Sequence, residues 1–181
     1  MHHRSMPPSS ALVLPDPSLV LLIGVAGAGK TTLAARHFVA GEILSSDALR
    51  AVISGDETDQ RASGAAFAAL HRELGRRLAA GRLVVIDATN VRARHRRPLL
   101  TIAARTGTPV AAIVLDLPRT VVLARNAGRD RIVPEDVIDR QLAWLRETID
   151  GDQLRAEGVD PIHVLRDEAA VGGLAIRRRR G

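Results

Sequence analysis

The stretch that decides the fold reads Leu19-Val20-Leu21-Leu22-Ile23-Gly24-Val25-Ala26-Gly27-Ala28-Gly29-Lys30-Thr31. It opens on an unbroken apolar run, which is typical of a strand that is buried on both faces. Residues 24–31 then fit the pattern G-x-x-x-x-G-K-[ST], in which glycines let backbone N–H groups wrap around phosphate oxygens. We expect a helix over residues 31–39, so its N-terminal dipole would also face the phosphates. The stretch therefore predicts a P-loop that binds a nucleotide.

Lys30 is the only lysine in the chain. It stands where a compact ammonium can neutralise the β- and γ-phosphates. The Thr31 hydroxyl is predicted to ligate Mg²⁺ beside them. The predicted cofactors are thus ATP, or another NTP, and Mg²⁺. Within this stretch the residues predicted to bind the nucleotide are Gly24, Val25, Ala26, Gly27, Ala28, Gly29, Lys30, Thr31 and Thr32.

Apolar runs alternate with segments of helical periodicity along the rest of the chain. Strands are expected at residues 19–23, 43–44, 83–87, 109–115 and 161–165. Helices are expected at residues 31–39, 62–80, 94–105, 119–129 and 134–149, with Pro98 as a kink or a break near the start of its helix. This alternation predicts a doubly wound α/β protein with a P-loop kinase fold, in which helices cover both faces of a parallel five-stranded sheet.

The length of 181 residues suits one domain, which we place at residues 18–175. Residues 1–17 are rich in Pro, Ser and His and predict a flexible leader. Residues 176–181 predict a solvated basic tail, with nucleic-acid contact as the alternative. The helices near residues 125–150 are expected to form a lid over the nucleotide.

Composition excludes several classes of site. The chain has no cysteine, so disulfides and cysteine-based zinc sites are excluded. The longest apolar stretch is interrupted by glycines and is too short to span a bilayer, and no signal peptide is recognisable. A cytoplasmic protein without a membrane partner is therefore expected. The formal charge of +6 suits a polyanionic partner, although a general preference for arginine would give the same excess.

Two aspartates end predicted strands. Asp87 closes an apolar strand in the Walker B manner, which predicts a role at the Mg²⁺ site, with a purely structural cap as the alternative. Asp47 ends the strand after the P-loop helix. Because ligands bind at the carboxyl ends of parallel strands, its carboxylate can orient an attacking hydroxyl. The alternative for Asp47 is an N-cap of a helix that begins at Ala48.

Arginines gather in two places. Arg125, Arg129 and Arg131 fall at the end of a predicted helix, and Arg125 and Arg129 have the i, i+4 spacing of one helix face. They can close over a nucleotide and stabilise the transferred phosphoryl group, or lie on a solvated helix end. The second place is a basic cluster that can contact phosphates or form a solvated helix face. It consists of Arg92, Arg94, His95, Arg96 and Arg97.

Together these segments resemble the kinase domain of bacterial polynucleotide 5′-kinases, the module found beside phosphatase and ligase domains in RNA repair proteins. The resemblance covers residues 21–164. It is carried by the P-loop, by Leu44-Ser45-Ser46-Asp47 with Arg50, by Gly55-Asp56-Glu57-Thr58-Asp59-Gln60, by Phe67 with Leu70-His71, by Val85-Ile86-Asp87-Ala88-Thr89-Asn90-Val91, and by Arg125-Asn126 with Arg129.

The resemblance implies a kinase that phosphorylates the 5′-hydroxyl of an RNA or DNA end. It implies that Asp47 is the general base and that Arg50 holds the acceptor. It also assigns Arg125 and Arg129 to the lid, and with Lys30 these residues make up the predicted catalytic set. Separate phosphatase or ligase proteins are expected as companions. Two other functions stay open: a small-molecule kinase for a sugar, nucleoside or antibiotic hydroxyl, and a nucleotide-dependent switch.

Overall fold

The computed structural model of the chain describes residues 11–48 and 63–180. Its centre is a five-stranded sheet of order β3-β4-β2-β5-β6, in which every neighbouring pair is parallel. This confirms the predicted α/β class and the parallel five-stranded sheet. The strands are β2 (Leu19–Gly24), β3 (Ile43–Ser45), β4 (Val84–Asp87), β5 (Val110–Leu115) and β6 (Ile162–Leu165).

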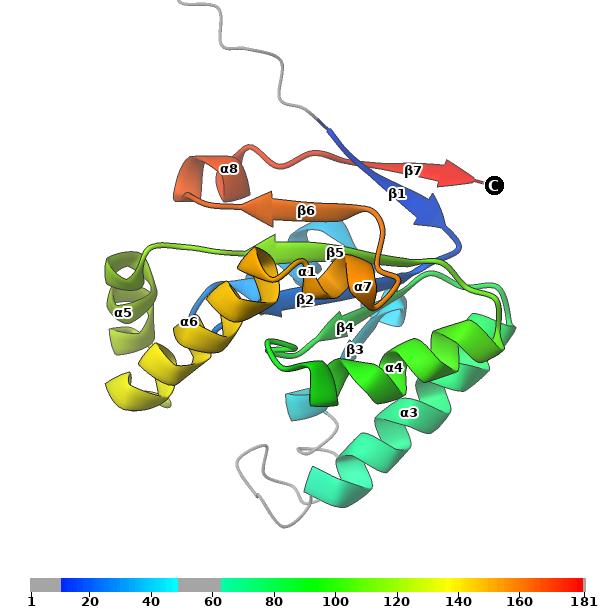
Figure 1. The fold of residues 1–181 in the computed structure, drawn as a ribbon, viewed down its shortest axis with the longest axis horizontal. Coiled ribbons are helices and arrows are strands. Elements are labelled where there is room, and N and C mark those ends of the chain that lie inside the picture. The colour runs from blue at the N-terminus through cyan, green and yellow to red at the C-terminus, as the bar shows by residue number, and fades with distance from the viewer. Residues whose placement is uncertain (1–10, 49–62, 181) are drawn as a thin grey trace, which may run out of the picture.

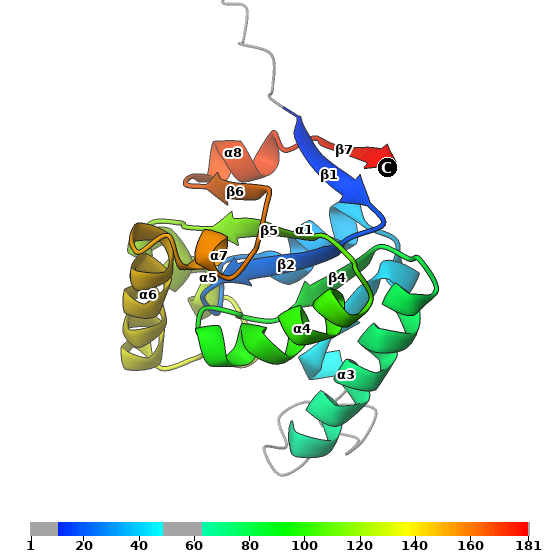
Figure 2. The ribbon, with the colours of Figure 1, turned by 45° about the vertical axis from the view of Figure 1, so that its right-hand side comes forward.

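Helices connect and cover the strands. Figures 1 and 2 show α4 and α6 on one face of the sheet and α1 on the other, with α5 and α6 at the end toward which the strands point. No helix in the described ranges is long and apolar enough to cross a membrane. The helices are α1 (Lys30–His37), the 3-10 helix η1 (Ala40–Glu42), α3 (Ser63–Ala79), α4 (Ala93–Arg105), α5 (Arg119–Ala127), α6 (Glu135–Asp150), α7 (Gln153–Ala156) and α8 (Glu168–Gly172).

The apolar runs become the core because helices cover the sheet on both faces. All residues of the central strands β2 and β5 are buried, as continuous apolar strands in parallel sheets require. Pro98 does not break α4. The helix begins before it, at Ala93, and continues through it to Arg105.

The two ends of the chain differ from expectation. Residues 12–16 and 176–180, predicted as parts of a loose leader and a solvated tail, form the parallel pair β1 (Leu12–Asp16) and β7 (Ile176–Arg180). Leu14 is fully buried, which gives β1 an apolar anchor. Arg178 on β7 donates two hydrogen bonds to Glu42, at 2.6 and 2.8 Å. The run of arginines did not indicate a strand, because the carboxylate of Glu42 comes next to Arg178 only in the folded protein.

Candidate functional site

The P-loop lies between β2 and α1, at the carboxyl end of the central strand, where the strand order reverses. Open α/β sheets bind ligands at this point. Gly24 is packed against β5, since a Cβ there would lie 3.1 Å from the Leu115 carbonyl oxygen. Gly29 has a φ of 94°, a left-handed conformation that favours glycine and turns the chain into α1. The glycines of the motif thus shape a loop that opens directly onto a helix N-terminus.

Lys30 is folded back over this loop. Its Nζ donates hydrogen bonds to the carbonyl oxygens of Gly24 and Val25, both at 2.9 Å. Burial lowers the pKa of Lys30 to about 8; the Asp87 carboxylate opposes this shift and the positive charge of Arg129 adds to it. A buried ammonium held by two carbonyl groups is already positioned to meet a phosphate.

Thr31 and Asp87 meet although 56 residues separate them. The Thr31 Oγ1 donates a hydrogen bond of 2.7 Å to Asp87 Oδ2. Strand pairing explains the contact, because β4 lies beside β2 with Asp87 opposite Leu22. Asp87 is buried. One hydroxyl and one carboxylate oxygen fit Mg²⁺, which commonly takes one or two carboxylates and completes its shell with water and substrate phosphates.

Arg125 closes over the P-loop from α5. Its Nη1 donates to the Ala28 carbonyl oxygen at 2.9 Å, and its Nη2 forms an ion pair with Glu168 Oε1 at 2.8 Å. Arg125 Nη1 also lies 3.0 Å from the position that a Cβ on Gly29 would take. Arg125 therefore contacts two elements of the site, the loop and α8.

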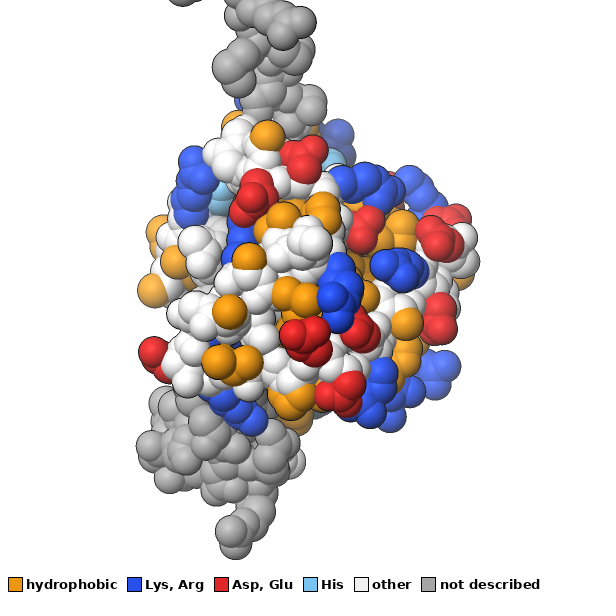
Figure 3. Space-filling view, turned by 90° about the vertical axis from the view of Figure 1, so that its left-hand side faces the viewer, with side chains coloured by type: hydrophobic (Ala, Val, Ile, Leu, Met, Phe, Trp, Pro, Cys, Tyr) orange, Lys and Arg blue, Asp and Glu red, His pale blue; other side chains and the backbone are white. Residues whose placement is uncertain are grey.

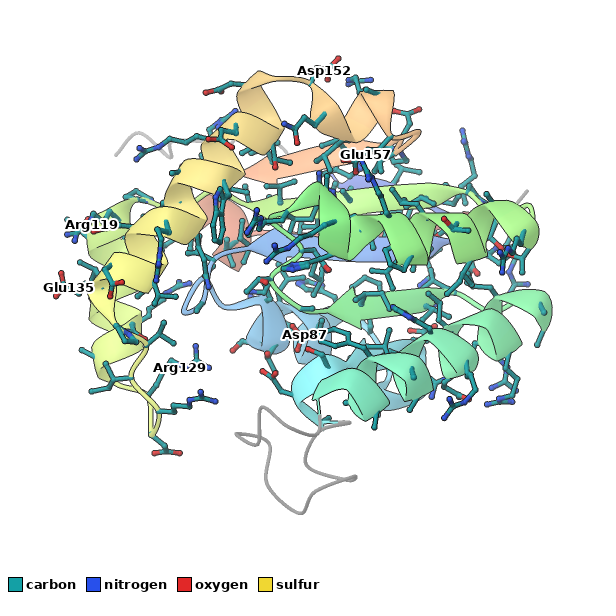
Figure 4. All side chains as sticks on the ribbon, turned by 60° about the horizontal axis from the view of Figure 1, so that its bottom comes forward. Asp87, Arg119, Arg129, Glu135, Asp152 and Glu157 are labelled. Carbon is teal, nitrogen blue, oxygen red and sulfur yellow. The ribbon has the colours of Figure 1, made fainter. Side chains whose placement is uncertain are left out.

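Arg129 reaches the same region by another route. The helix α5 ends at Ala127, so Arg125 and Arg129 do not share a helix face, and that expectation is corrected. Gly128 caps the helix, and Arg129 begins the connection to α6. Figure 4 shows Arg129 on this connection, on the side nearer Asp87, and its charge acts on Lys30. Arg131, the third of this group, is exposed.

An open, shallow depression of about 460 Å³ adjoins Arg125. It lies between α5 and α8 and is lined by Thr120, Val121, Ala124, Arg125 and Glu168.

Asp47 lies at the same edge of the sheet. It follows β3, whose Ser45 pairs with Asp87 in the register of β3 and β4. The helix after β3 begins at Ser46, and the Ser45 Oγ accepts a hydrogen bond of 3.4 Å from the Ala48 N–H. Ser45 therefore takes the capping position that was the alternative for Asp47, while Asp47 is exposed in the first turn. Arg50 and residues 55–60 lie outside the described residues.

The expected cluster of arginines around α4 is split by the fold, and that expectation is corrected. Arg96 is fully buried, with bonds of 2.7 Å to Glu157 and 2.8 Å to the Asn90 carbonyl oxygen. One turn earlier, the Arg92 guanidinium stacks over Trp144 at 4.3 Å. Arg94 and Arg97 are exposed. Helical periodicity explains the division, since i and i+4 residues share one face.

Comparison with known families decides the identity at the level of the domain. The sequence profile of a family described as "AAA domain" matches residues 19–148, which is most of the chain. The chain belongs to this AAA domain family. No curated protein matches its sequence.

Solved structures share the fold of the AAA domain. A chain of the Pnkp1/Rnl/Hen1 RNA repair complex aligns with a TM-score of 0.66 at 20% identity, over 76% of this chain and 47% of that chain. This chain thus spans about half the length of that relative. A putative kinase from Chloroflexus aurantiacus gives a TM-score of 0.57 at 19% identity, over 83% and 88%. A gluconokinase from Sinorhizobium meliloti gives 0.51 at 18%, over 88% and 93%. The AAA domain therefore has the fold of P-loop kinases.

Sequence reasoning missed two contacts of the AAA domain that join α6 to the site. The Ala26 N–H donates a hydrogen bond of 2.8 Å to Gln141 Oε1. Farther along α6, the Thr148 hydroxyl donates to the Val91 carbonyl oxygen at 2.9 Å. The partners are 115 and 57 residues apart, so no local pattern could indicate them.

The surface around the site carries both signs of charge. Figure 3 looks onto the end of the molecule where α5 and α6 lie in Figure 1, and basic and acidic side chains are interspersed on it. One reason is pairing: Arg119 on α5 bonds to Asp139 on α6 at 2.6 Å and to Glu135 at 3.1 Å. The positive charge available to phosphates on this end therefore comes from particular groups, above all Lys30, rather than from a uniformly basic face.

Proposed function

We propose that this protein transfers the γ-phosphoryl group of ATP, or of another NTP, to the 5′-hydroxyl of an RNA or DNA end. The observation that carries the proposal is the position of Asp47. It stands in the first turn after β3, at the sheet edge that also holds the paired Thr31 and Asp87, and the Ser45 Oγ accepts the capping bond from the Ala48 N–H. A carboxylate at this edge suits a hydroxyl acceptor better than a nucleotide-dependent switch, which needs no acceptor site.

The donor half has a defined task for each group. The P-loop N–H groups and Lys30 hold the β- and γ-phosphates, and Arg125 and Arg129 add positive charge above them. Thr31 and Asp87 would hold Mg²⁺, which neutralises charge between the β- and γ-phosphates. The base of the nucleotide is assigned to the open depression between α5 and α8, which Arg125 lines.

In the transfer step, the acceptor half supplies one group, the carboxylate of Asp47. The attacking hydroxyl donates a hydrogen bond to the Asp47 carboxylate and is thereby aligned with the γ-phosphorus. A new O–P bond forms as the bond from the γ-phosphorus to the bridging oxygen breaks. The nucleoside diphosphate leaves, and the hydroxyl proton passes to Asp47. Arg125 and Arg129 act as a lid that stabilises charge on the moving group.

Three observations support a polynucleotide end as the acceptor. Residues 44–47 and 85–91 resemble those of polynucleotide 5′-kinases. The fold is shared with a chain of an RNA repair complex. The net charge is +6, and Arg94 and Arg97 are exposed on α4, a helix that begins at the carboxyl edge of the sheet. The second candidate, a small-molecule kinase, is favoured by the gluconokinase, whose length this chain covers almost completely.

Transfer of labelled phosphate from γ-labelled ATP to a panel of acceptors tests the proposal. The panel contains 5′-hydroxyl RNA and DNA oligonucleotides, a nucleoside 3′-monophosphate, a nucleoside and gluconate. We expect oligonucleotides to be labelled best, with an RNA repair phosphatase or ligase supplied separately to process or join the ends. Labelling of the small alcohols alone would overturn the polynucleotide acceptor and leave the small-molecule kinase.

A further inference from the structure

Gln141 on α6 lies directly against the P-loop. Its Oε1 accepts a hydrogen bond of 2.8 Å from the Ala26 N–H, in a partly buried position. This is the backbone amide of the third residue of the motif that begins at Gly24. The P-loop motif does not itself require that one of its backbone amides bond to a side chain of another helix, so this contact is a specific feature of the fold.

The position of Gln141 is set by the packing of α6. Ile138 and Leu145 are fully buried, so the helix face that carries Gln141 is anchored in the core. Farther along the same helix, Thr148 bonds to the Val91 carbonyl oxygen and Trp144 lies beneath Arg92. Gln141 is thus presented to the loop by a helix that is fixed at several points.

The chemistry of the amide fixes its orientation. A backbone N–H can only donate, so the atom of Gln141 that faces Ala26 must be the carbonyl oxygen. The other branch of the amide, Nε2, then points away from Ala26 and carries two N–H donors. Within the described residues, Nε2 donates no hydrogen bond. The side chain therefore has one atom anchored and one atom ready to donate.

The anchored amide lies at the phosphate end of the loop. Lys30 Nζ is bonded to the carbonyl oxygens of Gly24 and Val25, so the ammonium lies next to the residues that precede Ala26. The P-loop lysine meets the β- and γ-phosphates. The Gln141 amide and the Lys30 ammonium are thus bonded to the same short segment of the loop, residues 24–26.

We propose that Gln141 is a phosphoryl-binding residue. Its Oε1 is anchored by the Ala26 N–H, and its Nε2 donates a hydrogen bond to an oxygen of the phosphoryl group that is transferred. The residue moves no proton; it supplies a neutral, preorganised donor where charge gathers in the transition state. This inference rests on the proposed phosphoryl transfer, but it does not depend on which hydroxyl accepts the phosphate.

The test compares ATP with ADP. Gln141→Met keeps the length of the side chain and removes both the acceptor and the donors, while Arg140→Met, one residue away and exposed, is the matched control. Because the proposed bond reaches only the terminal phosphoryl group, Gln141→Met should weaken ATP binding by about threefold to tenfold and leave ADP binding unchanged. It should lower kcat by about 10²-fold. The measurements are calorimetric titration and single-turnover transfer.

The outcomes separate the inference from its alternatives. If Gln141 only fastens α6, Gln141→Met should weaken ATP and ADP equally and lower the melting temperature, and the proposal fails. If Gln141→Met does not fold, Gln141→Glu keeps the acceptor for Ala26 and removes the donors; because its charge repels every phosphate, it should weaken both nucleotides but weaken ATP by a larger factor than ADP, and an equal loss for the two would contradict the proposal. A parent enzyme that binds ATP and labels none of the polynucleotides would contradict the proposed acceptor alone, since the comparison of ATP with ADP would still stand.

Discussion

The donor half and the acceptor half of the site are built in different ways. In the donor half, Lys30, Thr31 and Arg125 are joined to the P-loop or to Asp87 by hydrogen bonds of 2.7 to 2.9 Å. In the acceptor half, Asp47 is exposed in the first turn of its helix. Every NTP carries the same triphosphate, so one compact motif can encode its binding. Acceptors differ between kinases, so their contacts come from surface positions that can vary without disturbing the core.

The largest expected effect comes from removing the centre of the donor half. Lys30→Ala should reduce transfer by at least about 10³-fold, because a buried cation at the β- and γ-phosphates is lost. The melting temperature and the far-ultraviolet circular dichroism should stay near those of the parent. Transfer within threefold of the parent would contradict the assignment of the P-loop.

Asp47→Asn should impair the acceptor half of the site and leave nucleotide binding by the donor half intact. We expect transfer to fall by about 10²-fold, since the neutral amide cannot accept the hydroxyl proton, while the Kd for ATP stays unchanged. Loss of the charge from the first helical turn should cost at most about 1 kcal/mol of stability, because Ser45 keeps the cap. Asp47→Ala serves as the control for side-chain volume. Near-parent rates for Asp47→Asn would restrict Asp47 to a structural role.

A pH titration should test the role of the Lys30 ammonium in the donor half. The pKa of Lys30 is lowered to about 8, so the ammonium loses its proton as the pH rises through about 8, and the affinity for ATP should then fall by up to about tenfold per pH unit. Stability should move the other way. Between about pH 8 and 10.5 the unfolded chain holds a proton that the folded protein has released, so this group makes the fold more stable as the pH rises.

Lys30→Met is the control for both effects. It should remove the fall in ATP affinity above pH 8 and the matching rise in stability, as measured by calorimetric titration and by denaturant unfolding between pH 7 and 10. An identical pH dependence in Lys30→Met would show that another group is responsible.

The smallest expected effect concerns the acceptor half. If the acceptor is a single-stranded polynucleotide, its binding should weaken with log[salt] at a slope of about −0.7 per phosphate contact. With about two to four contacts, tripling the salt should weaken it about fivefold to twentyfold. The double variant Arg94→Gln, Arg97→Gln should flatten this slope and leave the KM for ATP unchanged. Arg96 is left intact, because it is buried against Glu157 and its removal would disturb the fold.

The matched control is Arg82→Gln with Arg105→Gln. These exposed residues precede β4 and end α4, at the opposite edge of the sheet, and their replacement lowers the net charge by the same amount. The slope should remain that of the parent. A flat salt response in the parent, with equal use of short and long acceptors, would favour the small-molecule kinase.

Local patterns were sufficient for much of the fold. The run of five apolar residues before Gly24 and the helical period after Lys30 gave β2 and α1 within a residue or two. The same reasoning did not indicate the strands at the ends of the chain, where Leu12 and Leu14 pair with Ile176 and Arg178. Pairing between segments more than 150 residues apart leaves no periodic trace in either segment.

By itself, the sequence determined the P-loop, the parallel sheet and the candidate donor residues, because glycine conformations, apolar runs and a lysine at a phosphate site are local requirements of the chain. Only the tertiary structure decided which distant side chains meet. It placed Asp87 on Thr31, Gln141 on Ala26 and Glu157 on Arg96. It also separated Arg96 from its exposed neighbours and gave Ser45 the capping position that was the alternative role for Asp47. These outcomes depend on the order of the strands and on which face of a helix is buried, and those are properties of the packed whole.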